Sequence, residues 1–185
     1  VVFFPSNPRA GDPSGLNVFA LWLLCGLLPW TFFSAVVSSG AGSLVDNANL
    51  IQKVSFSRIV LPFSTVGAAA YNWMFEIAVL LIAITIAGGF VLPWIPLVIV
   101  AMALLALFAA GVALLFSIAN VYFRDTQYLL TIVLQFWLYL TPIIYPIERV
   151  ANKSAEIGGL GGTPVRIVDI YNFNPMVHFV ALFRE

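Results

Sequence analysis

Residues 77 to 123 form a run of 47 residues without a single charged side chain. An α-helix of that length would extend about 70 Å, more than twice the roughly 30 Å hydrocarbon core of a bilayer. The run must therefore contain a turn, and two glycines and two prolines supply one in the segment "GGFVLPWIP" at 88 to 96. This constraint predicts two membrane-spanning helices joined by a short connection.

The composition agrees with a membrane location. Hydrophobic residues make up 62% of the 185 and charged residues only 9%, with a mean hydropathy of +1.02. Soluble domains are about one-quarter charged. Eight basic side chains balance eight acidic ones, so no excess charge favours nucleic acid as a partner. The single Cys25 lies in an apolar run and is expected to be a buried hydrophobe, since it cannot form an internal disulfide.

Four segments are long and apolar enough to be predicted as complete transmembrane helices. They cover approximately residues 16–39, 61–87, 96–120 and 126–147. The polar run "SSGAGS" is expected to follow the first span, and Asp125 is a plausible N-cap of the fourth. Pro142 should bend the fourth span, with Thr141 re-satisfying the freed backbone. A further helix is expected to begin at Pro175, after a mixed-charge loop from 148 to 169. The fold class is therefore an all-α polytopic membrane protein, with residues 1–185 in one transmembrane domain.

A polar insert, "NANLIQKVSFSRIVLP", separates the first two spans. Asp46 or Asn47 can cap a short helix there. Four apolar side chains fall on one face at helical spacing: Leu50, Ile51, Val54 and Leu61. The pattern is compatible with an amphipathic helix on the membrane surface and equally with a polar loop that has a cationic edge.

Several kinds of chemistry have no support in the sequence. Neither lysine lies in a phosphate-binding G-x-x-x-x-G-K-[ST] motif, so any ATP must be hydrolysed on another chain. The only histidine, His178, has no nearby cysteine or acid in sequence, and no metal-ligand cluster is present. We therefore expect neither an enzyme nor a bound cofactor.

Glu76 is the one ionisable side chain deep inside a predicted span. An acid at that depth costs about 2.5–3.5 kcal/mol on insertion scales, so it is a candidate for the transport mechanism or for a structural hydrogen bond. Aromatic residues are abundant at 15%, and their faces suit the apolar faces of sugar rings, although most should contact lipid or other helices. The candidates for a channel or gate are Phe32, Phe33, Trp73, Glu76, Trp137, Tyr139 and Pro142.

Three segments give the chain a family resemblance. They are residues 27–62, 120–146 and 172–184, which read "LLPWTFFSAVVSSGAGSLVDNANLIQKVSFSRIVLP", "NVYFRDTQYLLTIVLQFWLYLTPIIYP" and "NFNPMVHFVALFR". In the sequence, order and spacing of these segments, the chain resembles the membrane subunits of type-2 ABC exporters that move polysaccharides such as O-antigen, teichoic acid and galactan. Ser57 departs from the family pattern, which usually has proline before the arginine.

The resemblance implies six spans with both ends in the cytoplasm, so this chain would be a fragment that lacks the first and last spans. It places residues 44–60 in the cytoplasm as a coupling helix that docks on a nucleotide-binding ATPase. The expected contacts are Asn49, Leu50, Lys53, Arg58, Arg124 and Asp125. A simple count of Lys and Arg in the loops favours the opposite orientation, with most positive charge in the long C-terminal tail. The resemblance also implies a re-entrant gate within 148–175.

The resulting hypothesis is a permease subunit in the inner (plasma) membrane. It would form a homodimer, contact membrane lipid and move a lipid-linked glycan, while ATP binds to the partner subunit. The alternatives are an ABC permease for drug or lipid efflux and an ion-coupled carrier that uses Glu76. A membrane-embedded transferase would need a cluster of acids or a histidine at the interface, which the sequence does not provide.

Overall fold

The computed structural model describes residues 19–55, 57–86, 92–141, 143 and 173–184. Over these ranges the chain is helical, without a strand. The elements are α1 (Phe19–Asp46), α2 (Ala48–Lys53), α3 (Val60–Ile86), the 3-10 turn η1 (Leu92–Trp94), α4 (Ile95–Tyr122), α5 (Thr126–Leu140) and α8 (Pro175–Leu182). Since α1, α3 and α4 are long and apolar enough to cross a bilayer, the predicted all-α membrane fold is confirmed.

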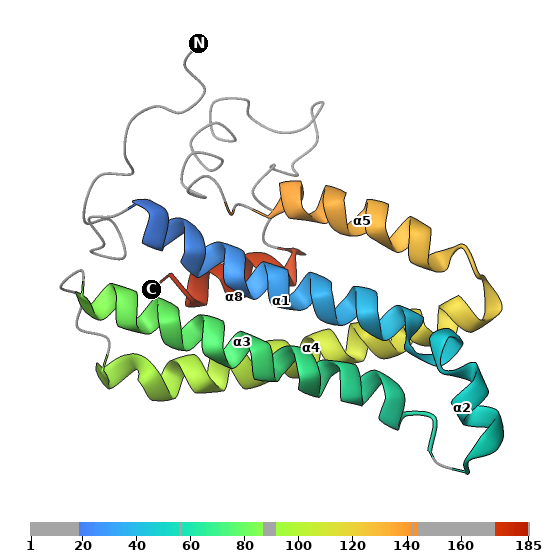
Figure 1. Ribbon diagram of the computed structural model, residues 1–185. Coiled ribbons are helices and arrows are strands. Elements are labelled where there is room, and N and C mark those ends of the chain that lie inside the picture. The colour runs from blue at the N-terminus through green and yellow to red at the C-terminus, as the bar shows by residue number, and fades with distance from the viewer. Residues whose placement is uncertain (1–18, 56, 87–91, 142, 144–172, 185) are drawn as a thin grey trace, which may run out of the picture.

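α1 is the central helix of the described bundle. It contacts α3, α4, α5 and α8, and Figure 1 shows α3 and α4 on one side of it and α5 on the other. More of α1 is buried than of the other two long helices. α5 packs against both α1 and α4.

The predicted end of the first span at residue 39 was wrong, because α1 continues through "SSGAGS" to Asp46. These weak helix formers are held by packing against α4. A Cβ added to Gly40 would lie 2.6 Å from the Cβ of Ala113, so the two backbones approach closely. The buried Ser43 Oγ donates to the Gly40 carbonyl at 2.7 Å, which satisfies the hydroxyl inside the helix.

Polar side chains also join α1 to α4. The Asn120 side chain is buried, and its Nδ2 donates to the Ala41 carbonyl at 3.0 Å. The Oγ atoms of Ser43 and Ser117 lie 3.5 Å apart one turn away. The small residues of "SSGAGS", which the sequence suggested would follow the helix, therefore lie within α1 and form its contact with α4.

The second and third spans agree with their predictions. α3 begins at Val60 and α4 ends at Tyr122, each within two residues of the predicted limit. η1 lies directly before α4 and contains Pro93, and Pro96 occupies the first turn of α4, where its missing N–H is not needed. The expected break after α3 falls at 87–91, outside the described residues.

The fourth predicted span is shorter than expected. α5 has 15 residues and ends at Leu140, and Thr141 is extended with φ −99° and ψ 126°. The residue before a proline is driven out of the helical region, which explains why the helix stops there instead of bending further on. Thr141 Oγ1 donates to the Trp137 carbonyl at 3.0 Å, whereas the Leu138 carbonyl, which loses its helical donor at Pro142, accepts from the Thr141 backbone N–H at 3.2 Å. The hydroxyl therefore does not serve the carbonyl for which it was predicted. Pro142 and the possible re-entrant segment before residue 173 lie outside the described residues.

α8 begins at Pro175, as predicted, and Asn174 ties it to α5. The Asn174 Oδ1 atom caps α8 by accepting from the Met176 N–H at 3.0 Å and also accepts from Trp137 Nε1 at 2.8 Å. Its Nδ2 donates to Thr141 Oγ1 at 3.2 Å. At the other end of α8, the Arg184 guanidinium carbon lies 3.7 Å from the centroid of the Trp22 ring on α1.

Candidate functional site

A groove between α1 and α5, which we name the α1–α5 groove, is lined by polar side chains at the middle of both helices. Its volume is about 310 Å³. The lining residues are Trp30, Ser34, Ala35, Ser38, Thr131, Leu134, Gln135 and Leu138. Four of these eight side chains carry a hydroxyl or amide group, although the surrounding helices are strongly apolar. Polar groups at membrane depth normally face a partner or water, so this groove is a functional candidate.

The hydrogen bonds within the groove determine what it can recognise. Ser34 Oγ donates to the Thr31 carbonyl at 3.1 Å, and Thr131 Oγ1 donates to the Gln127 carbonyl at 3.1 Å. Each hydroxyl uses its only proton within its own helix, so its oxygen keeps lone pairs for a donor in the groove. The Gln135 side chain is exposed and can both donate and accept. The arrangement suits a hydroxyl-rich ligand.

These four polar side chains were not among the predicted site residues, although the sequence contains a signal for them. Ser34 and Ser38 are four residues apart, and so are Thr131 and Gln135. Residues at that spacing share one face of a helix. Two polar pairs on otherwise apolar helices were therefore visible, but their proximity depended on how α5 packs against α1.

The predicted aromatic channel residues have different surroundings. Phe32 stacks on Trp73 with ring centroids 4.1 Å apart, and Phe33 stacks on Phe108 at 5.6 Å. The side chains of Phe32, Phe33 and Trp73 are at most 3% exposed. In this conformation of the single chain their surfaces serve packing between α1, α3 and α4, so their assignment to the channel stays a prediction.

Two other aromatic candidates lie on α5. The Trp137 ring meets Phe33 edge to face at 5.3 Å and is partly buried beside the α1–α5 groove. Tyr139 is 65% exposed, so its ring is on the outer surface of the described chain. Trp137 therefore packs α5 against the core, whereas the ring of Tyr139 is accessible for contact with another molecule.

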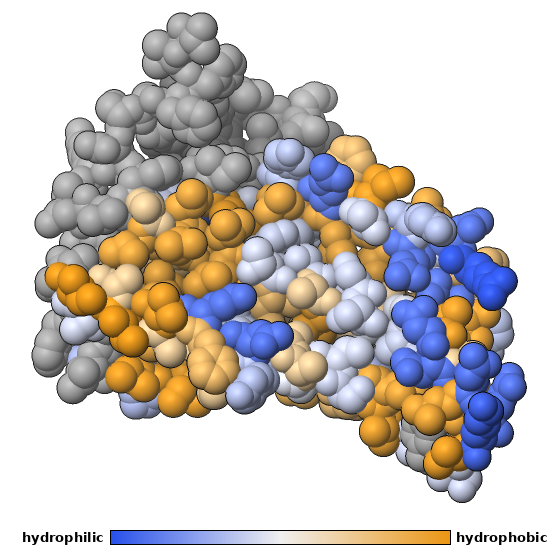
Figure 2. Space-filling view, viewed as in Figure 1, coloured by the Kyte–Doolittle hydropathy of each residue, from blue (hydrophilic) through white to orange (hydrophobic). Residues whose placement is uncertain are grey.

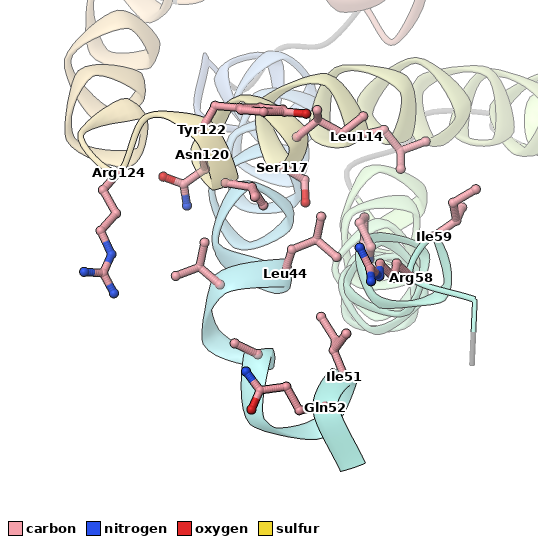
Figure 3. A pocket seen from close by; sticks show the side chains of 15 residues that line it. Leu44, Ile51, Gln52, Arg58, Ile59, Leu114, Ser117, Asn120, Tyr122 and Arg124 are labelled. Carbon is pink, nitrogen blue, oxygen red and sulfur yellow. The ribbon is translucent and has the colours of Figure 1, made fainter. Parts of the chain in front are cut away.

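A second cavity, which we name the α2–α4 pocket, lies where α2, the start of α3 and the end of α4 meet (Figure 3). Its volume is about 750 Å³. The lining residues are Leu44, Val45, Ala48, Ile51, Gln52, Arg58, Ile59, Pro62, Leu114, Ser117, Ile118, Asn120, Val121, Tyr122 and Arg124. Arg58 and Arg124 lie on opposite sides of the pocket in Figure 3, with apolar side chains between them.

α2 itself projects at the end of the bundle where α1 finishes and α3 begins (Figure 1). None of its six residues is buried. The proposed single amphipathic face was wrong in part, because the helix ends at Lys53, Val54 is extended, and Leu61 is buried within α3. Hydrophilic surface gathers over this end of the molecule, whereas the flanks of the spans are hydrophobic (Figure 2).

The predicted caps at this end do not form with side chains. Asn47 is the N-cap of α2 by position, but its Nδ2 donates back to the Ser43 carbonyl at 2.8 Å, and Asp46 is the last residue of α1. Asp125 is the N-cap of α5 by position, again without a side-chain cap hydrogen bond. Asn47 and Asp125 therefore occupy N-cap positions as predicted, but neither side chain accepts a hydrogen bond from the first turn of its helix.

The six predicted coupling residues divide into two sets. Asn49, Leu50 and Lys53 are exposed on α2 and do not line the α2–α4 pocket. Arg58 and Arg124 line it, while the exposed Asp125 does not. The structure therefore gives the two arginines a shared environment that differs from that of the α2 side chains.

Glu76 lies on the exposed face of α3, one turn after the exposed Asn72. A small hydrophilic area interrupts the hydrophobic surface over the middle of α3 (Figure 2). Glu76 lines neither the α1–α5 groove nor the α2–α4 pocket. Its predicted role in a channel or gate therefore stays a prediction.

Comparison of the sequence with known proteins identifies the family of this chain. Residues 2–157 match the family described as ABC-2 type transporter. The O-antigen export system permease protein RfbA of Myxococcus xanthus is 31% identical over 168 residues, covering 90% of this chain and 62% of that protein. The protein of the same name from Klebsiella pneumoniae is 26% identical over 171 residues, covering 90% and 60%.

A relative that is named for a different polysaccharide gives similar coverage. The polysialic acid transport protein KpsM of Escherichia coli is 26% identical over 180 residues, which cover 90% of this chain and 60% of KpsM. The chain thus spans about 60% of the length of these curated relatives. With three helices able to span a membrane among the described residues, and a family match over most of its length, the chain belongs to the membrane components of the ABC-2 type transporters.

Proposed function

We propose that this chain is part of a permease that exports a polysaccharide across the plasma membrane, driven by ATP hydrolysis on a separate subunit. The observation that carries the proposal is the α1–α5 groove, because its exposed lone pairs suit sugar hydroxyls. The relatives named for O-antigen and polysialic acid export support the same substrate class.

The groove is open on one side, and a second copy of the permease would complete it. Apolar side chains elsewhere on the spans tolerate lipid, but Ser38, Thr131 and Gln135 gain nothing from it. A two-fold arrangement that brings two α1–α5 grooves together would enclose a polar path at the centre of the dimer. The Trp30 side chain also lines the groove, but it is 5% exposed and packs on Phe33 and Trp137, so the polar side chains are the ones that would contact the sugar.

In this proposal α2 is the element that receives work from the ATPase. Its Asn49, Leu50 and Lys53 side chains are exposed and lie beyond the ends of the spans. Closure of two ATPase subunits around ATP would displace α2 and, through α1 and α3, change the width of the groove. The orientation that follows places α2 in the cytoplasm.

Two alternatives fit the geometry less well. A permease for apolar drugs or lipids would be better served by an apolar path than by a groove in which half of the lining side chains are polar. An ion-coupled carrier needs a titratable group at the substrate path, yet the described linings of the groove and the pocket contain neither Asp nor Glu.

Cross-linking from α2 tests the coupling. In the full-length permease, Leu50→Cys should form a disulfide or a short cross-link with a cysteine placed on the ATPase. Leu97→Cys is the matched control, since it is exposed on the first turn of α4, at the other end of the spans. The native Cys25 is 5% exposed and should contribute little background.

Export should also require ATP hydrolysis by that subunit and should persist when the proton gradient is collapsed but ATP is maintained. Cross-linking from Leu97→Cys in place of Leu50→Cys would reject the proposed orientation. Loss of export on collapse of the proton gradient alone would favour the ion-coupled carrier.

A further inference from the structure

We infer that the α2–α4 pocket binds an anionic glycerophospholipid, with its anionic headgroup held in the cationic environment that Arg58 and Arg124 create from opposite sides and an acyl chain along α4. The inference concerns a lipid that stays with the protein and not the exported substrate. It rests on the proposed orientation only in naming the cytoplasmic leaflet as the source of the lipid.

The apolar wall of the pocket matches an acyl chain. Leu114, Ile118 and Val121 line it from α4, and their spacing of three or four residues forms one stripe along the helix. Ile118 is 53% exposed and Val121 is 57% exposed, although both belong to the last two turns of a membrane-spanning helix. A chain that enters between α3 and α4 would cover this stripe and remain within the hydrocarbon layer.

The charges at the mouth of the pocket select the headgroup. Two arginines line the pocket, and no Asp or Glu is among its fifteen described lining residues. Guanidinium groups bind phosphate through charge-assisted and often paired hydrogen bonds. Cationic pockets between membrane helices on the cytoplasmic side are suited to anionic headgroups. A zwitterionic choline headgroup would bring its own cation to the same place.

A buried acceptor in the lining suggests a hydroxyl in the headgroup. Asn120 is 2% exposed, and its Oδ1 accepts no hydrogen bond from the described part of the protein. Its Nδ2 is already used by the Ala41 carbonyl. The glycerol headgroup of phosphatidylglycerol combines a phosphate with hydroxyl donors, so this lipid is the natural probe.

The site leaves the proposed ATPase contacts free. Asn49, Leu50 and Lys53 do not line the pocket, so a lipid there need not cover the exposed side of α2. The lipid would instead join the α2–α3 connection, through Arg58, to the end of α4, through Arg124. It would thereby stiffen the segment through which we propose that motion of α2 reaches the spans.

Native mass spectrometry of the purified full-length permease, without the ATPase or glycan, tests the site. Titration with phosphatidylglycerol should show one or more saturable adducts per subunit with an affinity about tenfold higher than for phosphatidylcholine. Arg58→Gln and Arg124→Gln should each weaken phosphatidylglycerol binding about tenfold. Lys53→Gln removes the same charge outside the pocket and should change the affinity less than twofold.

A third variant separates the apolar wall from the charges. Ile118→Trp keeps both arginines but fills the pocket, and it should reduce binding of both lipids while the protein retains its oligomeric state. Equal affinity for the two lipids, or an equal loss in Lys53→Gln, would overturn the inference. Because neither ATP nor export enters the measurement, its failure would leave the proposed transport function standing.

Discussion

The α1–α5 groove and the α2–α4 pocket both include residues of the central helix α1 but differ in size, position and charge. The groove is small, lies at mid-span and carries neutral polar groups on half of its lining side chains. The pocket is larger, lies at the end of the spans and combines an apolar wall with two arginines. A neutral hydrogen-bonding surface suits a ligand that must pass, whereas a charged mouth over an apolar wall suits one that stays.

The difference shows how one helix serves two purposes. On one face of α1, Ser34 and Ser38 keep their oxygens available in the groove. Further along, Gly40 and Ser43 are buried against α4. Small and hydroxyl residues thus occur together in one stretch of sequence, but on one side they line the proposed glycan path and on the other they allow close packing.

The largest effect should come from blocking the groove. Ser38→Trp places an indole where a serine now leaves space, and we expect export to fall to background while the protein remains in the membrane. Val79→Trp, on the exposed face of α3 at 67% exposure, should export normally. Surface glycan and membrane protein level are measured together. Full export by Ser38→Trp would remove the groove from the path.

The packing seam provides the next test. Gly40→Ala forces a Cβ within 2.6 Å of the Ala113 Cβ, so we expect a loss of about 1–3 kcal/mol in stability from overpacking. Gly111→Ala meets no atom within 4 Å and should be neutral or slightly stabilising. Thermal unfolding in detergent compares the two. Equal stability would mean that the α1–α4 contact is looser than described.

A smaller effect is expected from a substitution that removes the polarity of a groove side chain but keeps its shape. Gln135→Leu keeps the approximate size of the side chain but removes its donor and acceptor, so export should slow about two- to tenfold, as expected for one or two lost hydrogen bonds. Gln127→Leu makes the same change at an exposed residue in the first turn of α5 that lines neither the groove nor the α2–α4 pocket, and it should leave the export rate within twofold. The ratio of the two rates measures how specifically the groove uses polarity.

A change in stability without a change in the groove should come from the contact that fixes the far end of α5. Asn174→Ala removes the cap of α8 and the bonds to Trp137 and Thr141, with an expected cost of about 1–2 kcal/mol. Asn174→Ser can restore the cap but not both bonds to α5. Thermal unfolding should therefore place the serine variant between the alanine variant and the wild type. If both variants match the wild type, Asn174 does not hold α5 to α8.

Much of the fold could be predicted because length and hydropathy constrain a membrane helix. The 3-10 turn η1 at Leu92–Trp94, the long helices α3 and α4 and the start of α8 at Pro175 follow from charge-free length and from the positions of proline and glycine. The end of the first span was wrong because serine and glycine at 38–43 have low helix propensity. Only the contact with α4 explains why the helix continues there.

The site was less predictable, because it depends on which helices meet. Phe33 and Trp73 were expected at a channel from composition, yet tertiary packing buries both rings. The polar pairs at 34/38 and 131/135 become a groove only when α5 lies beside α1. Arg58 and Arg124 are 66 residues apart in sequence, and their shared pocket follows from the antiparallel course of α3 and α4.

Protection of single cysteines by the transported glycan tests the central claim most directly. Ser38→Cys and Gln135→Cys in the full-length permease are labelled with a hydrophilic thiol reagent, with and without a glycan stalled during export. Lys53→Cys, exposed on α2, provides the reference rate. The α1–α5 groove as the glycan path predicts that the stalled glycan slows labelling at 38 and 135 but not at 53. Unchanged labelling at 38 and 135 while a glycan occupies the transporter would contradict it.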